Sequence, residues 1–446
     1  MSLSVFLKNN LKNIPPAIGL LINKLPYAYR PGIGKVYRER RQQITEFSNY
    51  SEGKKKQFVF ERMKALVDHA YQQVPFYREY YTARKFDPRQ LKSFDDLEAI
   101  PIVDKAILKE YPLEYRSAQT KGRYLVNTGG STGTPFSLYI EPSSMGHEWA
   151  HMHHLWEKLG YRPTDLKLLF GGRSDLNGPL EYDVLRNHFA VDIYSDYALV
   201  AKALKKQLTK YSIPYLHGYP SAIYDFALYV GERDPELIDL LKKTLKGVFL
   251  GSEYPQTRFR STIEKTFDVP SISWYGHTER CILAGELEEK YTYNPFCTYG
   301  YTEAEKANDE GDHYLIGTSY YNFASPLIRY NTNDLIADLQ YKDAILSGFR
   351  IAHGREGEFV VDAAGKKISL TGLIFGRHHE LFNSSDFIQV RQPEPGRIEI
   401  HYVSTQITEG SARELFDHRN LNFQMDFIRR DAPVRTSSGK VNLLIK

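Results

Sequence analysis

Helical and extended patterns alternate along the middle of the chain, and this alternation constrains the fold more than any other sequence feature. Helical patterns space apolar residues three or four apart, whereas strands are short runs rich in β-branched and aromatic residues. The predicted order is helix Met145–Leu159, strand Leu166–Gly172, helix Ala198–Thr209, strand Tyr215–Gly218, helix Ser221–Tyr229, strand Gly247–Gly251, helix Thr257–Phe267 and strand Ser271–Tyr275. Strands joined by helices predict a layered α/β core.

The segments on either side of this core have different patterns. A long helix is predicted over Lys55–Tyr81, and Ser93–Lys105 has the composition of a loop. Two further strands, Tyr314–Ser319 and Asp334–Asp338, follow the core without long helices between them. A second sheet is therefore expected.

Length and chain breaks predict more than one domain. The chain has 446 residues, which exceeds the size at which a single hydrophobic core keeps growing. The Gly-Arg-Glu-Gly stretch at 354–357 is a natural boundary, because a new strand and turn begin after it. We expect a basic N-terminal arm over residues 1–50, a large α/β domain over 51–355 and a small α+β domain over 356–446.

The composition indicates which binding partners and which cellular compartment to expect. The formal net charge is only +4, so nothing in the charge balance requires nucleic acid. Cys281 and Cys297 are too few for a disulfide framework, which fits a reducing compartment. Neither a secretory signal nor a membrane span is recognised in the sequence, so a cytoplasmic protein is expected.

The first 41 residues are strongly basic and contain Glu39 as their single acid. Apolar side chains such as Leu21 and Tyr27 are interleaved with the lysines and arginines. This composition is compatible with two arrangements. The segment either packs on its own domain, which is the commoner outcome, or makes peripheral contact with an anionic inner-membrane surface.

The residues Asn127–Pro135 read Asn-Thr-Gly-Gly-Ser-Thr-Gly-Thr-Pro and lie between two predicted strands, Arg123–Val126 and Phe136–Ile140. Glycines let successive backbone N–H groups face one anion, and hydroxyl groups add further donors. A Walker-type loop would end in Gly-Lys-Ser/Thr and open a helix, so a P-loop NTPase is disfavoured. Taken alone, these residues fit a phosphate cradle and an ordinary hairpin turn equally well.

Four shorter motifs follow this loop along the chain. They are Gly251-Ser252-Glu253, Trp274-Tyr275-Gly276-His277-Thr278-Glu279, Arg329-Tyr330-Asn331-Thr332-Asn333-Asp334 and Arg435-Thr436-Ser437-Ser438-Gly439-Lys440. The first two close predicted strands, where ligands of α/β sheets commonly bind. Singly, each is also explained as a turn, a core tyrosine, a loop aspartate or a basic tail. Their order carries the functional inference.

In this order the motifs resemble those of the adenylate-forming, AMP-dependent synthetase superfamily. The glycine loop, Tyr-Gly-x-Thr-Glu, Tyr-x-Thr-x-Asp, Gly-Arg and the terminal Gly-Lys run from Asn127 to Lys440. His217-Gly218-Tyr219-Pro220-Ser221 and Val74-Pro75-Phe76-Tyr77-Arg78 add a resemblance to the phenylacetate-CoA-ligase-like branch, which includes CapK-like proteins of capsular-polysaccharide biosynthesis. The resemblance implies a large layered α/β N-terminal domain and a small, mobile α+β C-terminal domain.

The resemblance also implies ATP-dependent activation of a small carboxylic acid. An acyl-adenylate forms with release of pyrophosphate, and the acyl group then passes to coenzyme A or to an amine or hydroxyl acceptor, such as a sugar of a surface polysaccharide. Nucleotidyl transfer depends mainly on positioning and on neutralising negative charge, which agrees with the residue types present. ATP and Mg²⁺ are the implied ligands, and coenzyme A is one of the alternative acceptors.

Phosphate and metal contacts are assigned by the same resemblance. Glu279 would hold Mg²⁺, a hard cation suited to one carboxylate plus phosphate oxygens, and Thr278 would contact the α-phosphate. Lys440 would reach the substrate carboxylate and the α-phosphate during adenylation, where negative charge develops. The residues implied around the β- and γ-phosphates are Thr128, Gly130, Ser131, Thr132 and Gly133.

The adenosine contacts are implied in the same way. Ser252 and Glu253 would lie at the adenine, Tyr275 would stack on its face, and Gly276 belongs to the same nucleotide-binding motif. Asp334 would take the ribose hydroxyls.

The resemblance places Arg355 behind the ribose-binding aspartate and a hinge immediately after it. The hinge covers residues 356–358, where Gly357 favours movement of the small domain. Two departures from the superfamily pattern affect the site: Asn333 replaces the usual glycine, and the loop opens with Asn127-Thr128-Gly129-Gly130 in place of Thr-Ser-Gly-Ser. The early region lacks a Cys/His cluster, so we predict no structural metal.

Two other classes of function compete with a ligase. His147-Glu148-Trp149-Ala150-His151 lies on a predicted helix and matches the His-Glu-x-x-His pattern of zinc metalloproteases, although the extended metzincin form is missing. A glutamate further along could still supply the third ligand. The other alternative is a non-catalytic nucleotide-binding scaffold. The charged residues that the chemistry needs are all retained, which favours an enzyme: Glu279, Asp334, Arg355 and Lys440.

Overall fold

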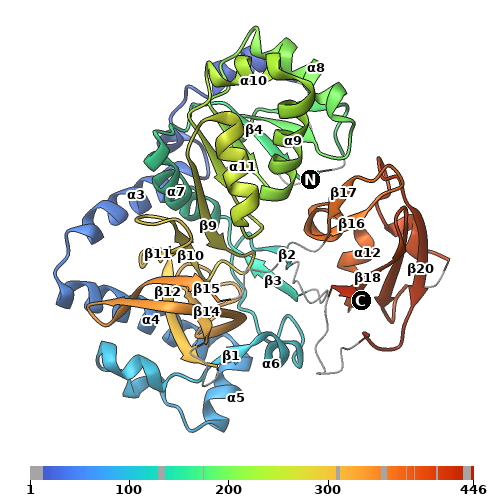
Figure 1. Ribbon diagram of the computed structural model, residues 1–446. Coiled ribbons are helices and arrows are strands. Elements are labelled where there is room, and N and C mark those ends of the chain that lie inside the picture. Colours follow the sequence, from blue (N-terminus) through green and yellow to red (C-terminus); the bar gives the residue numbers. More distant parts are fainter. Residues whose placement is uncertain are drawn as a thin grey trace.

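The computed structural model describes residues 14–128, 136–173, 175–307, 312–352, 359–377, 379–385, 387–407, 410–434 and 443–445. Figure 1 shows three groups of elements. The helices and strands of the middle of the chain lie at the top, a second group of strands lies at the lower left, and the C-terminal strands lie to the right, in red.

An eight-stranded sheet forms the centre of the upper part, in the order β11-β10-β9-β8-β7-β4-β6-β5. The five strands from β9 to β6 are parallel, and antiparallel strands flank them on both sides. The strands are β4 (Lys167–Gly171), β5 (Leu180–Asp183), β6 (His188–Asp192), β7 (Tyr215–Gly218), β8 (Gly247–Leu250), β9 (Ser271–Gly276), β10 (Leu283–Gly285) and β11 (Asn294–Pro295). The predicted α/β core is therefore confirmed.

Helices cover both faces of this sheet. Val248 and Leu250 of β8 belong to one apolar cluster, whereas Phe249 between them belongs to another, where its ring stacks on Trp156 at 4.6 Å. Successive strand residues thus face opposite helical layers. The helices of this region are α7 (Ser144–Trp156), η4 (Glu157–Leu159), α8 (Tyr197–Leu208), α9 (Pro220–Arg233), α10 (Pro235–Lys242) and α11 (Thr257–Phe267).

The expected second sheet is also present. It has the order β1-β14-β13-β12, with β15 paired to β14, and a separate hairpin of β2 and β3 flanks the glycine loop. The strands are β1 (Val103–Asp104), β2 (Tyr124–Thr128), β3 (Phe136–Ile140), β12 (Gly300–Lys306), β13 (His313–Ser319), β14 (Tyr330–Lys342) and β15 (Ile345–Ile351).

The N-terminal elements correct two sequence predictions. The predicted helix Lys55–Tyr81 is two helices, because Pro75 lacks an N–H and starts a new helix at its first position. The predicted loop Ser93–Lys105 contains η3 and β1, which pairs with a strand more than 200 residues away. The elements are α2 (Pro16–Ile22), η1 (Tyr27–Tyr29), α3 (Gly34–Ser48), α4 (Glu52–Gln73), α5 (Pro75–Ala83), η2 (Pro88–Gln90), η3 (Phe94–Ala99) and α6 (Lys105–Lys109).

The C-terminal elements form a two-stranded sheet, β16-β17, and a four-stranded sheet in the order β20-β19-β18-β21. They contact the end of β6: the Lys366 ammonium donates to the Ile193 carbonyl at 2.6 Å, and the Arg377 guanidinium lies 4.4 Å above the Tyr194 ring. The elements are β16 (Phe359–Val361), β17 (Lys367–Ser369), the π-helix η5 (Thr371–Gly376), α12 (Glu380–Asn383), β18 (Phe387–Glu394), β19 (Arg397–Val403), α13 (Ala412–Leu415), β20 (Gln424–Arg429) and β21 (Leu444–Ile445).

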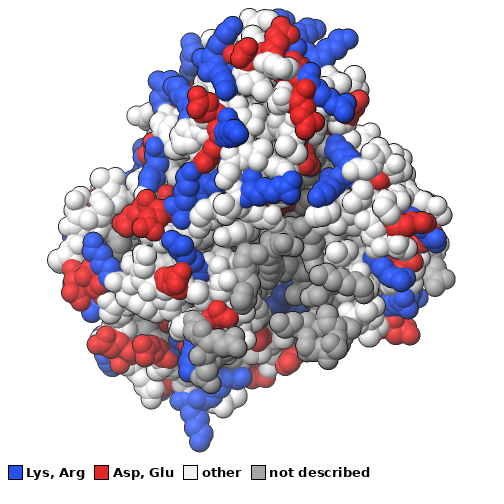
Figure 2. Space-filling view, in the orientation of Figure 1, with Lys and Arg blue, Asp and Glu red and all other residues white. Residues whose placement is uncertain are grey.

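The surface carries both signs of charge. Figure 2 shows lysine and arginine side chains interspersed with acidic ones over the upper helices and the lower left of the molecule. This mixture agrees with the small net charge and gives this face no large single-sign field. Within the described residues, no helix combines the length and the apolar composition that a membrane span requires.

A buried ion pair fixes α11 to the edge of the sheet. Arg260 donates to both carboxylate oxygens of Glu286, at 2.6 and 2.8 Å, and the two side chains are 2% and 3% exposed. Glu286 also accepts from the backbone N–H groups of Ser273 and Tyr291. The pair therefore holds helix α11 against β9, the strand that contains Tyr275.

Replacing Arg260 with methionine should lower the free energy of unfolding by about 3–5 kcal/mol, because the Glu286 carboxylate stays buried without its partner. Urea unfolding followed by circular dichroism measures the change. Arg258→Met is the matched control, since Arg258 is exposed on the same helix and its loss should cost less than about 0.5 kcal/mol. Equal stability of the two variants would contradict the structural role of the pair.

Candidate active site

The carboxyl ends of parallel strands bring the predicted site residues together. Strands β7, β8 and β9 run in the same direction, so the residues that follow them meet at one edge of the sheet. Gly251-Ser252-Glu253 follows β8, and Gly276 is the last residue of β9, before Thr278 and Glu279. The C-terminal elements contact the same edge beside β6.

Tyr275 and Asp334 form the central contact of the site. The Tyr275 hydroxyl donates to the Asp334 carboxylate at 2.7 Å, and the Tyr275 ring meets Phe349 edge-on with centroids 5.9 Å apart. Burial raises the pKa of Tyr275 well above its usual value, so the hydroxyl stays a neutral donor. Because Tyr275 lies on β9 and Asp334 on β14, this hydrogen bond joins the two large sheets.

Asn333 has a backbone conformation that explains why it can replace a glycine. Its φ of +60° lies in the left-handed region, which asparagine tolerates better than most residues other than glycine. Its N–H donates to the side chain of Asn331 at 2.8 Å, and the Asp334 N–H donates to the Thr332 hydroxyl at 3.2 Å. The substitution thus preserves the turn that presents Asp334.

Glu279 is a largely buried carboxylate at the same edge. Its Oε2 lies 3.1 Å from His277 Nδ1, and its side chain is 13% exposed. Burial acts to raise the pKa of Glu279, but the hydrogen bond to His277 and the charges of His277 and Lys105 outweigh it and lower the pKa. The carboxylate is therefore ionised at neutral pH. The neighbouring Thr278 is exposed.

Ser252 and Glu253 shape the end of β8. Ser252 has a φ of +67°, and the Glu253 carboxylate accepts from the Ser221 N–H at 3.2 Å, at the start of α9. Gly251 must be glycine, because a Cβ there would lie 2.2 Å from the Trp274 ring. The turn after β8 is therefore fixed by packing against β9.

Of the predicted phosphate-binding residues in the glycine loop, the structure describes Thr128. Thr128 ends β2, is 1% exposed, and its hydroxyl is buried with no hydrogen-bond partner within the described residues. Such an orphaned donor fits a site that a ligand completes. Several predicted site residues lie outside the described residues. They are Gly130, Ser131, Thr132 and Gly133 of the loop, together with Arg355 and Lys440. The predicted hinge at 356–358 also lies outside them.

Lys105 is a site residue that the sequence analysis missed. It opens α6 directly after β1, which pairs in parallel with Tyr330 and Asn331 of β14. Burial lowers the pKa of Lys105 to about 8, with Glu279 opposing the shift and Lys109 adding to it. Lys105 and Glu279 each influence the pKa of the other, so the two charges lie within electrostatic range. Only the pairing of β1 with β14 reveals this, because Ser93–Lys105 has no local motif.

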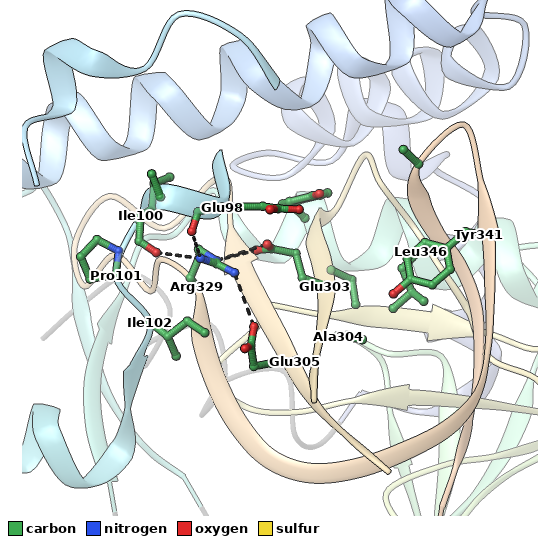
Figure 3. A pocket seen from close by; sticks show the side chains of 14 residues that line it. Glu98, Ile100, Pro101, Ile102, Glu303, Ala304, Glu305, Arg329, Tyr341 and Leu346 are labelled. Atoms are coloured by element: carbon green, nitrogen blue, oxygen red, sulfur yellow. Dashed lines mark hydrogen bonds and ion pairs between the residues drawn. The ribbon is translucent and has the colours of Figure 1, made fainter. Parts of the chain in front are cut away.

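Arg329 holds the segment that leads to Lys105. Its Nη1 donates to the carbonyls of Glu98 and Ile100, at 2.6 and 2.8 Å, and its Nε donates to the Glu303 carboxylate at 3.2 Å (Figure 3). The Val103 N–H donates to the Arg329 carbonyl at 3.1 Å. Arg329 thus links the residues before β1 to strands β12 and β14.

A cavity of about 590 Å³ surrounds this arginine (Figure 3). Glu98, Glu303 and Glu305 line it, and burial raises the pKa of Glu303 to about 7 although Arg329 opposes the shift. None of the predicted site residues that the structure describes lines the cavity. It therefore lies apart from the edge that carries Tyr275 and Glu279.

The His-Glu-x-x-His segment belongs to the core. His147 Nε2 lies 3.1 Å from the Tyr299 carbonyl, and His151 Nε2 lies 2.9 Å from the Thr298 hydroxyl. Burial lowers the pKa of His151 to about 3, so its ring is neutral. Among the described residues, no three His, Cys, Asp or Glu side chains are arranged to hold a metal ion. The zinc-protease alternative is therefore not supported.

Comparison with known proteins finds similarity at the level of structure. No family model and no curated protein matches the chain. A 2-hydroxyisobutyryl-CoA ligase bound to 2-HIB-AMP and CoA in the thioesterification state has a TM-score of 0.55 at 17% identity, over 88% of this chain and 89% of that chain. The same ligase with R3-HIB-AMP in the postadenylation state has a TM-score of 0.52 at 16% identity, over 87% of this chain and 89% of that chain.

An open conformation of that ligase, with 2-HIB-AMP and CoA, matches with a TM-score of 0.52 at 17% identity, over 88% of this chain and 91% of that chain. At this identity the likeness concerns the fold. The chain therefore has the fold of an adenylate-forming CoA ligase, as its ordered motifs predicted.

Proposed function

We propose that the chain is an ATP-dependent, AMP-forming ligase of the adenylate-forming superfamily. It would convert a small carboxylic acid to an acyl-adenylate, release pyrophosphate, and pass the acyl group to an acceptor. The observation that carries this proposal is the Tyr275–Asp334 pair, with the ionised Glu279 and the cationic Lys105 at the same edge of a parallel sheet. Within the superfamily we propose the phenylacetate-CoA-ligase-like branch, including CapK-like proteins, on the motifs quoted above.

The Tyr275–Asp334 pair would bind the adenosine. The Asp334 carboxylate would accept hydrogen bonds from the ribose hydroxyls, while Tyr275 presents an aromatic face beside it. Ser252, Glu253 and Gly276 would border the adenine, because they lie at the carboxyl ends of the two neighbouring strands β8 and β9. The hydrogen bond between the two sheets would set the distance between base and ribose contacts.

The residues fit a Mg²⁺ ion bound together with the phosphates of ATP. Glu279 offers one ionised carboxylate, and Mg²⁺ is commonly held by one or two carboxylates plus phosphate oxygens. When bound, the ion would neutralise negative charge on the phosphates. The orphaned hydroxyl of Thr128 is a donor of the kind that a phosphate oxygen would complete.

Positive charge would come from two lysines. Lys105 lies within electrostatic range of Glu279, and we propose that it contacts the phosphates that leave as pyrophosphate. Lys440 would contact the substrate carboxylate and the α-phosphate, as the motif order implies. Positioned cations stabilise charge that develops in the transition state, so adenylation needs little acid–base work.

The C-terminal elements would act as a mobile small domain. We propose a basic arm at 1–50, a large domain at 51–355 and a small domain at 356–446, with the hinge at 356–358 beside Arg355. The contacts of Lys366 and Arg377 with the residues after β6 support docking of this part at the substrate edge. Movement about the hinge would carry Lys440 toward and away from the phosphates.

Coenzyme A is the acceptor that the structural comparison favours, because the 2-hydroxyisobutyryl-CoA ligase was solved with CoA bound. An amine or hydroxyl of a sugar in a surface polysaccharide is the alternative implied by the CapK-like motifs. A cytoplasmic location stays a prediction from the sequence.

ATP–pyrophosphate exchange over a panel of carboxylic acids tests the proposed reaction. Exchange is expected with at least one acid, and Lys440→Ala should lower it about a hundredfold or more because a charge that stabilises the transition state is lost. Lys342→Ala is the control, since Lys342 is exposed on β14. Glu148→Gln should leave exchange unchanged. Mass analysis with coenzyme A or an amino sugar identifies the acceptor.

Two results of this experiment would point elsewhere. ATP binding by calorimetry without exchange on any acid would support the non-catalytic scaffold. Exchange that survives Lys440→Ala would remove the proposed role of that lysine.

The pH dependence of kcat/KM for ATP tests Lys105, because this ratio reports ionisations of the free enzyme. With a pKa of about 8, the ammonium is charged below pH 8 and loses its proton above it, so the wild-type ratio should fall on the alkaline side. Lys105→Arg should flatten that fall, since the guanidinium stays charged to about pH 12. Lys105→Met should lower the ratio about a hundredfold at neutral pH.

Lys92→Met serves as control, because Lys92 is exposed in the loop before η3. An alkaline fall that persists unchanged in Lys105→Arg would assign the ionisation to another group.

A further inference from the structure

Helix α2 and the turn after it present their apolar side chains to solvent. Ile18, Leu21, Ile22 and Leu25 are spaced as one helical stripe, and they are 46–63% exposed. Tyr29 extends the stripe and is 68% exposed. A surface helix of a globular protein usually buries its apolar stripe against the core. Here the apolar stripe faces solvent instead.

The face of α2 that packs on the protein includes Leu20, which contacts the main apolar core, together with the small residue Gly19 and the polar residue Asn23. Gly19 lies against Tyr182, where a Cβ would come within 2.3 Å of the ring, so only glycine fits. Asn23 is 2% exposed and donates to the carbonyls of Gly19 and Val184, at 2.9 and 2.8 Å. These contacts fix the helix with its apolar stripe outward.

The turn after α2 is anchored equally firmly. Tyr27 is buried, with its ring centroid 4.8 Å from His153 and 5.3 Å from Tyr37. The Arg30 guanidinium lies 4.0 Å above the Tyr27 ring and donates to Asn23 at 2.7 Å. The exposed stripe is therefore held by ordered contacts on its inner side, and its exposure follows from how the segment is built.

The charged residues of this segment itself have one sign. Residues 14–38 contain no aspartate or glutamate, and Lys24, Lys35 and Arg38 are exposed there. The β5–β6 turn adds the exposed Leu185 and Arg186, since Arg30 reaches the Leu185 carbonyl at 3.5 Å. In Figure 1 this dark blue segment lies behind α8 and α10.

We propose that this surface, which we define as Ile18, Leu21, Ile22, Leu25 and Tyr29 with Lys24, Lys35 and Arg38, docks on an anionic lipid bilayer. Apolar side chains enter the boundary between headgroups and acyl chains, an exposed tyrosine suits that boundary, and flanking cations are attracted to anionic lipids. A second copy of the chain is a poor occupant, because a two-fold contact would bring the cations of both copies together. The proposal concerns attachment and is independent of the catalysed reaction.

Flotation of the full-length protein with lipid vesicles tests the proposal. The protein should float with phosphatidylcholine vesicles that contain about 30% phosphatidylglycerol and much less with phosphatidylcholine alone, and salt should release it. Leu21→Asn with Tyr29→Asn should weaken binding at least about tenfold, because the apolar contact is lost. Lys24→Glu with Lys35→Glu should weaken it by about tenfold or more.

The matched control is Leu228→Asn with Tyr341→Asn, which changes the same residue types at exposed positions of α9 and β14. This control should float like the wild type. Circular dichroism of each variant checks that it is folded. Failure of the wild-type protein to float with anionic vesicles, or equal loss of binding in the control, would overturn the proposal. A dimer in light scattering that disappears in the Leu21/Tyr29 variant would also overturn it, in favour of a second copy.

Discussion

The hydrogen bond from Tyr275 to Asp334 joins the two large sheets, and the candidate site depends on that junction. Tyr275 lies near the end of a strand of the α/β core, whereas Asp334 follows a tight turn in a strand of the second sheet. The α/β core supplies the aromatic ring of Tyr275, and the second sheet supplies the carboxylate of Asp334. The proposed nucleotide site therefore exists only where the two layers meet, and anything that shifts one sheet against the other would separate its contacts.

Supporting interactions hold each side of this junction. On one side, the Arg260–Glu286 pair ties α11 to the strand that carries Tyr275. On the other side, Arg329 fastens the segment before β1, and the pairing of β1 with β14 sets Lys105 near Glu279. Both arginines are buried and fully engaged with carboxylates or carbonyls, so they act by positioning and have no direct part in the proposed chemistry.

Two surfaces of the molecule would serve different tasks. The edge of the parallel strands gathers charged and polar groups for small ligands, and the C-terminal elements pack beside it. The outward stripe of α2 gathers apolar and basic side chains instead. If both proposals hold, the enzyme would act on its substrates while attached to a membrane surface. An acceptor carried by a lipid would then be within reach, whereas free coenzyme A would gain little from attachment.

The local sequence was sufficient to predict helices and strands that have a clear pattern of apolar residues. The predicted bounds are correct for the strand Tyr215–Gly218 and the helix Thr257–Phe267, and the α/β fold is confirmed. These predictions succeed because the short-range periodicity of apolar residues reflects which face of each element is buried. Proline at position 75 marks the break between α4 and α5, although the helical spacing of apolar residues continues across it. Motif order gave the candidate residues of the site, and the roles of those outside the described residues stay predictions.

The tertiary structure decided those features of the site that depend on contacts between residues far apart in the sequence. Lys105 carries no motif, and only the pairing of β1 with β14 reveals it as a neighbour of Glu279. The His147/His151 pair matches a zinc site in sequence, yet the Nε2 atoms of the two rings lie at hydrogen-bond distance from the Tyr299 carbonyl and the Thr298 hydroxyl. The sequence by itself determined the elements and the order of the motifs, because these follow from local side-chain chemistry. The fold decided which charges meet and which apolar stripe faces solvent, because both depend on contacts that the chain makes only when it is packed.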